Sequence, residues 1–458
     1  MLNLIAQNGR RDCDGWRRRE CLRVGVLGLG GLTLPGLLAA KAATGESAKE
    51  TSVVLLFLTG GPSQIESFDP KMTAPAEVRS ATGETATSLP GVTFGGTFPK
   101  LARLAKQMAV VRSFTHGNSN HTGGVEDVIQ GRNRTGAGMG SIAARLRGAT
   151  HPATGLPTHV YLDYAEKDPQ YNKERLRLLK AASAASLGAP YSPFQPAGGG
   201  QVNRNLTLNI SASRLHDRRA LRRSLDRLHR RVDLLDELAA VDTFEQQAFD
   251  LILGKAKAAF DLANEDPRLV RKYDTSRFNT ALRIKNRPSS LGHQLLLARR
   301  LCEAGCGFIT IHNPGWDMHG GKTQFNVPAG METLGRPVDR AVSAFLQDVA
   351  ERGLSGRILL IVTGEFGRTP KVKSNGGRDH WPRLSTLAFA GGGLRMGQIV
   401  GRSNSRAEAP QSGVVTPENL LATVLHVLFD VASLRVRRGI PRELTAILER
   451  GEPIRSLI

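Results

Sequence analysis

The 458-residue sequence contains little cysteine, few aromatic residues and no run as long and apolar as a membrane span requires. Its four cysteines, Cys13, Cys21, Cys302 and Cys306, form no Cys-x-x-Cys pair, which argues against a disulfide framework and a cysteine zinc site. We therefore expect Cys302 and Cys306 to be buried free thiols. With 40% hydrophobic and 22% charged residues, the composition is globular and excludes a polytopic membrane protein, a fibrous chain and a wholly disordered one.

Acidic residues are also in deficit. The chain has 62 lysines and arginines against 41 aspartates and glutamates, a formal net charge of +21. Residues 1–50 hold eight basic and five acidic residues, so most of the excess belongs to the rest of the chain. Such a charge predicts an anionic partner, such as an acidic polysaccharide, a membrane surface, nucleic acid or an anionic small molecule. Aromatic residues make up 5% and no nucleic-acid-binding motif is present, which argues against nucleic acid.

The first fifty residues have the layout of an export signal. The basic segment Arg17-Arg18-Arg19-Glu20-Cys21-Leu22-Arg23 precedes an uncharged, glycine- and leucine-rich run over residues 24–40, and small residues follow. The paired arginines before Glu-x-Leu-Arg resemble a bacterial twin-arginine signal, with Cys21 where Phe or Leu is usual. We predict a signal segment over residues 1–50, export to the periplasm or beyond by the twin-arginine machinery, and no stable membrane span in the mature chain. The alternative is an ordinary amphipathic N-terminal helix.

Apolar strands alternate with helices along the rest of the chain. Strands are predicted at residues 52–58, 108–114, 158–162, 307–312, 357–362 and 385–390, and helices at residues 98–107, 123–130, 140–146, 338–351 and 417–429. Thr416 is the predicted N-cap of the last helix, with Pro417 at its first position. This alternation indicates an α/β fold with a mostly parallel central sheet and helices on both faces.

Residues 164–300 interrupt the alternation. Residues 164–200 are loop-rich, and a helical pattern without strand signals runs over residues 213–300. We predict a loop-plus-helical insertion over residues 164–300, within an α/β domain that spans residues 51–458. Residues 214–231 contain eight arginines and two aspartates, which indicates either a solvated helix face or a surface for polyanions.

Polar side chains gather after four of the predicted strands, where ligands bind in parallel sheets. The clusters are Ser63, Glu66 and Asp69; His116 and His121; Asp317 and His319; and Glu365, Arg368, Arg378, Asp379 and His380. Imidazole with carboxylate suits Zn, Mn or Fe, and carboxylate-rich sets suit Mg or Ca. Asp317-x-His319 or Asp379-His380 alone could be a turn-capping aspartate beside a surface histidine. Four clusters at equivalent strand ends favour a divalent-metal site.

Two common hydrolase and nucleotide-binding signatures are missing. No Gly-x-Ser-x-Gly elbow occurs, which argues against a Ser-His-Asp hydrolase. No Walker-type phosphate loop occurs either.

The motifs resemble those of a bacterial family common in planctomycetes, domain of unknown function 1501. The resemblance lies in the twin-arginine leader, Gly60-Gly61-Pro62-Ser63, Phe68-Asp69-Pro70-Lys71, Gly315-Trp316-Asp317-Met318-His319, Glu365-Phe366-Gly367-Arg368-Thr369-Pro370 and Gly377-Arg378-Asp379-His380-Trp381. This family looks like a branch of the alkaline phosphatase/sulfatase superfamily. The resemblance implies an alkaline-phosphatase-like sandwich, one or two metals at the strand ends and a nucleophile at a helix N-terminus.

The resemblance also implies roles for single residues. Asp317, His319 and His380 would bind a divalent metal (Zn, Mn, Ca or Mg), with Glu365 and Asp379 as further candidate ligands. His121 falls at the position of the nucleophile, with Thr122 adjacent. Phe366 and Gly60-Gly61 stand where the superfamily has ligands, so a full second metal site is in doubt; Ser63, Glu66 and Asp69 are nearby substitutes.

Alternatives remain for the catalytic candidates. Attack by His121 and attack by a water activated by metal are both chemically possible. His116 and His121 could instead be a hydrogen-bonded structural pair. Arg368 and Arg378 could neutralise charge on the transferring group, or they could be surface arginines in glycine-rich loops.

Two functions fit these observations. The first is an exported, metal-dependent hydrolase of anionic esters, either phosphate or sulfate. The second is a non-catalytic envelope protein that binds acidic or sulfated polysaccharide on the same fold.

Overall fold

The structure is a computed structural model, and it describes residues 48–163, 171–196, 255–282 and 286–458, together with residues 214, 217, 218 and 221. The predicted signal segment, apart from residues 48–50, lies outside the described residues. So do most of the arginine-rich segment at 214–231 and most of the helical pattern predicted before residue 255.

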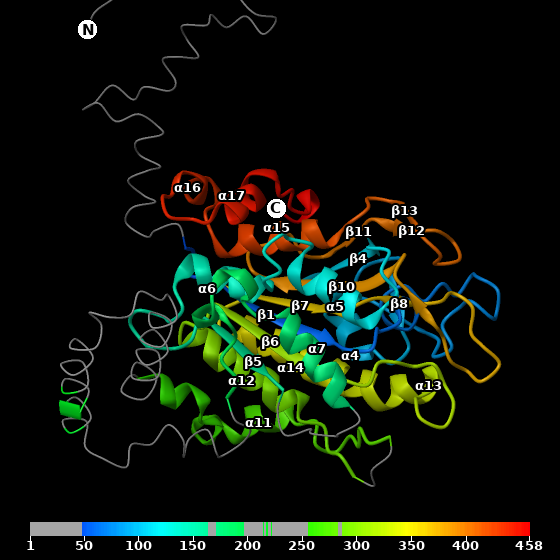
Figure 1. Cartoon of the computed structure of the whole chain (residues 1–458). Coiled ribbons are helices and arrows are strands. Elements are labelled where there is room, and N and C mark those ends of the chain that lie inside the picture. Colours follow the sequence, from blue (N-terminus) through cyan, green and yellow to red (C-terminus); the bar gives the residue numbers. More distant parts are fainter. Residues whose placement is uncertain are drawn as a thin grey trace, which may run out of the picture.

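Seven strands form the central sheet (Figure 1). In spatial order they are β11 (Gln398–Val400), β4 (Ala109–Phe114), β10 (Ser385–Gly391), β7 (Ile358–Thr363), β1 (Ser52–Leu58), β6 (Phe308–Asn313) and β5 (His159–Leu162). β10 runs antiparallel to both of its neighbours, and every other pairing is parallel. The predicted fold class, α/β with a mostly parallel sheet, is confirmed.

Strand β1 shows why the sheet is covered on both faces. All seven of its residues are buried, and the six apolar ones alternate between two apolar clusters. Val54, Leu56 and Leu58 face the first cluster, and Val53, Leu55 and Phe57 face the second. Because successive side chains of a strand point to opposite faces, a continuous apolar run requires helices on both sides.

Helices supply both layers (Figure 1). The first cluster takes residues from α4 (Pro99–Arg103), α11 (Pro267–Tyr273), α12 (Leu291–Glu303) and α14 (Arg336–Glu351). The second takes residues from α5 (His121–Gln130), α6 (Met139–Arg147), α7 (Asn172–Ala181), α15 (Pro417–Leu428), α16 (Val431–Val436) and α17 (Arg442–Arg450). In Figure 1, α15, α16 and α17 lie above the sheet, whereas α11, α12 and α14 lie below it.

Shorter elements complete the described residues. They are α3 (Gln64–Ser67), α13 (Val327–Gly330), a π-helical turn at Met331–Gly335, and 3-10 turns at Ala105–Gln107, Ala185–Leu187, Ala189–Tyr191, Lys255–Phe260, Leu262–Asn264 and Arg455–Leu457. Three two-stranded ribbons pair β2 (Glu84–Ala86) with β3 (Thr93–Gly95), β8 (Gly367–Arg368) with β9 (His380–Trp381), and β12 (Arg402–Ser403) with β13 (Pro410–Ser412).

Most predicted elements of the core are confirmed within one or two residues. Helix α15 begins after Thr416, whose backbone N–H donates to the Asn419 side chain. Cys302 and Cys306 are buried free thiols, as predicted. The prediction that residues 164–200 are loop-rich is wrong for residues 172–181, which form α7.

Helix α12 lies inside the predicted insertion and yet belongs to the core. Its residues Leu291, Leu295 and Leu301 are buried in the first apolar cluster. Its Arg299 side chain is 1% exposed and binds three carboxylates, those of Glu265, Glu303 and Asp348. Asp348 belongs to α14, so the network joins α12, α14 and the chain that enters at Glu265.

The two ends of the segment around residues 197–254 lie beside each other. Phe194 forms a β-bridge with Val160 of β5. Its ring packs against that of Phe260, with 6.3 Å between the ring centroids. The chain therefore leaves the core and returns to it at one place.

Within the part of the chain that the structure describes, no helix combines the length and the apolar character needed to cross a membrane.

Candidate functional site

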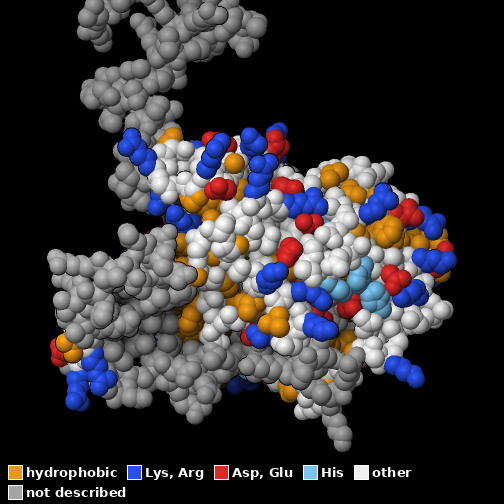
Figure 2. Space-filling view, in the orientation of Figure 1, with side chains coloured by type: hydrophobic (Ala, Val, Ile, Leu, Met, Phe, Trp, Pro, Cys, Tyr) orange, Lys and Arg blue, Asp and Glu red, His pale blue; other side chains and the backbone are white. Residues whose placement is uncertain are grey.

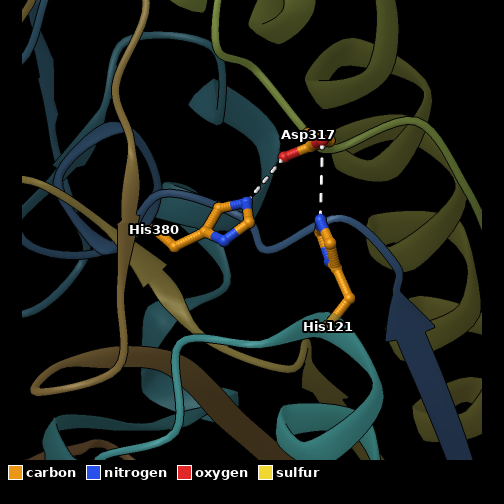
Figure 3. Close-up of side chains that lie close together, drawn as sticks. All are labelled: His121, Asp317 and His380. Atoms are coloured by element: carbon orange, nitrogen blue, oxygen red, sulfur yellow. Dashed lines mark hydrogen bonds and ion pairs between the residues drawn. The ribbon is translucent and has the colours of Figure 1, made fainter.

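Four chain segments meet at the carboxyl edge of the parallel strands. His121 is the first residue of α5, which follows β4. Asp317 follows β6, Glu365 follows β7, and His380 lies in β9, just before β10. His121 and His380 both point at the Asp317 carboxylate (Figure 3). The strand-end clusters that the sequence indicates therefore converge in space.

Gly60 allows the loop after β6 to approach the end of β1. Its φ is +110°, and a Cβ atom there would lie 2.3 Å from the backbone nitrogen of Asp317. The Trp316 N–H donates to the Thr59 carbonyl at 3.0 Å, and the Trp316 ring, 1% exposed, donates to Asn313 at 2.8 Å. These contacts hold the backbone on which Asp317 is carried.

The start of α5 orients His121. The Asn120 side chain caps the helix by accepting from the backbone N–H groups of Thr122 and Gly123. On the ring itself, Nδ1 lies 2.8 Å from Glu365 Oε1, and Nε2 lies 3.6 Å from Asp317 Oδ2. Burial opposes charge on the ring, but the bonds with Asp317 and Glu365 outweigh it and raise the pKa of His121 to about 9.

Three lone-pair atoms form a compact triangle. Asp317 Oδ1 lies 3.0 Å from His319 Nε2 and 3.1 Å from His380 Nε2, and the two Nε2 atoms lie 2.9 Å apart. Imidazole nitrogens at such a distance share either a proton or a cation. Two ligand atoms with bonds of about 2.1 Å to one ion lie about 3.0 Å apart at right angles and about 3.4 Å apart in a tetrahedral site. Asp317, His121 and His380 also form a group close enough to hold a metal ion.

Asp317 is the centre of the charge network. Its Oδ1 accepts a 2.6 Å bond from the Arg368 guanidinium, and its Oδ2 accepts one of 2.6 Å from Gln324. Burial would raise the pKa of Asp317, but bonds with His121, His319 and His380 hold it far below its usual range. This carboxylate is therefore ionised and surrounded by donors.

His319 has a carboxylate on its other ring nitrogen. Its Nδ1 lies 2.8 Å from Asp379 Oδ1, which also accepts a 2.6 Å bond from Lys373. The bond from Lys373 and then that from His319 lower the pKa of Asp379. Asp379 thus lies behind His319, in the position of a residue that orients an imidazole.

Glu365 is buried, with one oxygen engaged and one without a partner. Its Oε1 accepts from the Gly60 N–H at 2.8 Å and contacts His121. Among the described residues, Oε2 has no hydrogen-bond partner although it is buried. A buried carboxylate oxygen without a donor costs free energy and suits a place where a cation or a proton is taken up.

The two candidate arginines are both fully buried, so the alternative of surface arginines is wrong. Arg368 reaches the cluster through Asp317, and it also donates to the carbonyls of Gly60, Gly61 and Trp316. Arg378 does not contact Asp317 or the histidines. Its guanidinium pairs with Glu66 at 3.0 Å and donates to backbone carbonyls nearby.

The other candidates lie outside the triangle. Ser63 caps α3, Glu66 binds Arg378, and Asp69 pairs with Lys71 and Arg112, so none of these three substitutes for a ligand. His116 has a buried side chain that bonds the Glu365 carbonyl, and burial lowers its pKa. Thr122 is exposed beside His121. The alternative that His116 and His121 have a structural role therefore fits His116. It does not fit His121, which faces Asp317.

A pocket of about 510 Å³ opens beside the cluster. Its lining includes His121 and Asp317, and also Lys173, Glu174 and Arg177 of α7. Figure 2 shows the histidines gathered at one place on this face, with acidic side chains beside them and basic ones around. The α7 residues were missed because the loop-rich prediction covers them; the apolar pair Leu178 and Ala181, three residues apart, is the signal that indicates a helix there.

Comparison with known proteins gives one family and several remote structures. The model of a family described as "Protein of unknown function (DUF1501)" matches residues 50–458. No curated protein matches the chain.

Three solved structures of bacterial hydrolases are remotely similar to this chain. A sulfatase from Pseudoalteromonas sp. has 10% identity, a TM-score of 0.33 and coverage of 86% of this chain and 71% of its own. A phosphonate monoester hydrolase from Silicibacter pomeroyi has 10% identity, a TM-score of 0.34 and coverage of 88% of this chain and 76% of its own. An alkaline phosphatase from the Antarctic bacterium TAB5 has 11% identity, a TM-score of 0.30 and coverage of 86% of this chain and 99% of its own. Likeness this remote says nothing of activity.

Proposed function

Since the chain belongs to the DUF1501 family, whose function is unknown, we propose its function from the geometry of the site: an exported, metal-dependent hydrolase of phosphate or sulfate esters. The observation that carries the proposal is the triangle of Asp317 Oδ1, His319 Nε2 and His380 Nε2, with edges of 2.9 to 3.1 Å. It lies at the carboxyl edge of a parallel sheet, beside an open pocket.

Asp317, His319 and His380 would hold the metal. Two imidazoles and one carboxylate suit Zn, Mn or Fe better than Mg or Ca, because the latter prefer sets made of oxygen alone. A bound divalent ion polarises the ester oxygen and stabilises the charge that develops on it. Asp379 orients His319, and Arg368 fixes the Asp317 carboxylate.

His121 is the catalytic side chain of the proposal. It lines the pocket, Glu365 fixes its Nδ1, and its Nε2 faces the Asp317 carboxylate. Direct attack by Nε2 requires the ring to lose its proton first, against the raised pKa of His121, and would leave the phosphoryl or sulfuryl group on the ring, whereas attack by water would leave none. Quenching in alkaline denaturant after single turnover, which preserves a bond from the ring nitrogen to phosphorus or sulfur, followed by mass spectrometry of the His121 peptide at alkaline pH, distinguishes the two routes.

The pocket carries positive charge for an anionic substrate. Lys173 and Arg177 both line it, one helical turn apart on α7. Neither has an ion pair with any residue that the structure describes. Cations without carboxylate partners in a pocket favour an anionic group on the ligand.

The metal is tested by elemental analysis of the full chain. Wild-type protein should retain about one transition-metal ion per chain, and His380→Asn and Asp317→Asn should lose it. His426→Asn is the matched control, because His426 lies on α15 and its side chain is remote from the triangle. Equal metal content in all four proteins would refute the site.

The activity is tested with phosphate and sulfate esters in the presence of Zn, Mn, Ca or Mg. Release of phosphate or sulfate by the wild type, lost in His380→Asn, supports the proposal. The alternative function is an envelope protein that binds acidic or sulfated polysaccharide. It predicts salt-sensitive binding to a sulfated glycan with no turnover, and that result would replace the hydrolase.

Export is the part of the proposal that rests on residues outside the described ranges. Replacing Arg18 and Arg19 by lysines should keep the chain in the cytoplasm, because the twin-arginine signal depends on that pair. Unchanged export of the double variant would remove this part and leave the hydrolase intact.

A further inference from the structure

Glu174 has one carboxylate oxygen held and the other unengaged. It lies in the first turn of α7, and its Oε2 accepts a 2.6 Å bond from the Thr59 hydroxyl and a 3.3 Å bond from the Gly315 N–H. Its Oε1 has no hydrogen bond with any residue that the structure describes. The side chain lines the same pocket as His121 and Asp317.

A buried histidine sets the direction of the Thr59 bond. His312 Nε2 lies 2.9 Å from the Thr59 hydroxyl oxygen. Burial lowers the pKa of His312 to about 3, so the ring is neutral at ordinary pH. When its Nε2–H donates to Thr59, the Thr59 hydroxyl hydrogen is left for Glu174 Oε2. Oε2 then receives two hydrogen bonds, and a proton on the carboxyl group goes to Oε1.

Burial and two neighbouring carboxylates favour the protonated form of Glu174. Burial contributes most, and repulsion from Glu365 and Asp317 adds to it, while the bonds from Thr59 and Gly315 oppose it. Together they raise the pKa of Glu174 to about 7. Lys173 and Arg177 lie near it on its own helix, and His121 lines the same pocket; these cations favour the carboxylate. A carboxyl group poised near neutral pH can both give and take a proton there.

We propose that Glu174 is the catalytic acid of the ester hydrolysis, with Thr59 and His312 as positioning residues. This role rests on the proposed function. As the bond between phosphorus or sulfur and the leaving oxygen breaks, its electron pair stays on that oxygen, which takes the proton of Glu174 Oε1 and leaves as an alcohol. Glu174 becomes a carboxylate, and it regains a proton from the water that hydrolysis consumes.

Leaving-group dependence tests the role. Aryl esters such as 4-nitrophenyl phosphate and 4-nitrophenyl sulfate need little protonation of the leaving oxygen, whereas methyl phosphate and methyl sulfate need it fully. Glu174→Gln should keep most of its kcat/KM for the aryl esters and lose about 10²- to 10⁴-fold for the alkyl esters. Glu449→Gln, at an exposed position of α17, is the matched control and should behave as wild type. Equal losses on both classes of ester would overturn the assignment.

Thr59→Val tests whether Thr59 positions the proton of Glu174, because it should change the pH dependence of kcat/KM, which a purely structural role of Thr59 would leave unchanged. Loss of the hydroxyl removes a bond that stabilises the Glu174 carboxylate, so the pKa of Glu174 should rise. Because a catalytic acid must be protonated, the alkaline limb of kcat/KM should move to higher pH in Thr59→Val. The limb should be absent in Glu174→Gln.

Infrared titration of the labelled Glu174 carboxyl group follows the same proton without turnover. It should give a midpoint near neutral pH in the wild type and a higher one in Thr59→Val. An unchanged midpoint refutes the positioning role of Thr59. A titrating Glu174 in a wild type that hydrolyses no ester refutes the proposed function, and the catalytic role falls with it.

Discussion

Replacing Arg378 by methionine tests whether this arginine has a structural role or a catalytic one. The side chain is fully buried, and its guanidinium lies 3.0 Å from Glu66 Oε1. It also donates to the backbone carbonyls of Val78, Arg79 and Thr369, at 3.0 to 3.1 Å, and to that of Pro370. Methionine keeps most of the length of the side chain and removes every one of these bonds.

The expected loss of stability follows from the groups that lose their partner, namely the Glu66 carboxylate and the backbone carbonyls. Removing one partner of a buried ion pair costs about 3–5 kcal/mol, because the other charge remains buried. Glu66 keeps donors from Ser80, Ala81 and Thr82, which favours the lower end of that range. Carbonyls left without donors each cost about 1–3 kcal/mol unless water reaches them. We expect Arg378→Met to lower the free energy of unfolding by at least about 4 kcal/mol, and by more if water does not reach the four carbonyls.

Urea unfolding at pH 7 measures this loss. The control is Arg357→Met, because the Arg357 side chain is 57% exposed and pairs with an exposed glutamate; it should cost under about 1 kcal/mol. The double variant Glu66→Gln, Arg378→Met should be more stable than Arg378→Met alone, since no buried charge is left unpaired. A fully stable Arg378→Met that has lost ester hydrolysis would refute the reasoning and return Arg378 to the substrate.

Three other substitutions test other parts of the structure. Gly60→Ala should lower the free energy of unfolding by about 1–3 kcal/mol more than Gly83→Ala, and it should lower the metal content measured by elemental analysis. A Cβ at Gly60 would lie 2.3 Å from Asp317 N, whereas one at Gly83 would meet nothing within 4 Å. Asp379→Asn should weaken metal affinity about 10- to 100-fold in a chelator competition, because a neighbouring imidazole loses its charged partner; unchanged affinity would contradict the orienting role. His159, buried with its pKa lowered to about 3, stays neutral when folded but gains a proton when unfolded below about pH 6.5, so stability falls as pH drops. From pH 7 to 5, urea unfolding should show a loss about 2 kcal/mol larger in the wild type than in His159→Gln.

The strands could be predicted because burial on both faces of a sheet leaves a continuous apolar run in the sequence. β6 and β7 are such runs, and the rule that ligands gather after parallel strands led from them to Asp317 and Glu365. The rule works because the carboxyl ends of β1, β6 and β7 are level in the sheet, with Phe57 opposite both His312 and Thr363.

The burial and the orientation of the side chains in these motifs could not be predicted from the sequence. Arg368 and Arg378 lie ten residues apart in similar glycine-rich loops, and only packing sends one to Asp317 and the other to Glu66. Glu174 comes to the pocket by the docking of α7, and it lies 115 residues from its partner Thr59. No local pattern in the sequence encodes such a contact.

The contact between Phe194 and Phe260 has a consequence for how this architecture can change in size. Because the chain departs from the core and rejoins it at neighbouring points, the core has little dependence on how much chain lies between them. Each doubling of a flexible connection costs only about 0.6 kcal/mol. Arg299, bound to Glu265 and Asp348, fixes the returning end independently. The described residues on both sides of this contact are thus held by bonds and packing of their own, and an exchange of the sequence between residues 196 and 255 should change the free energy of unfolding of the sheet little.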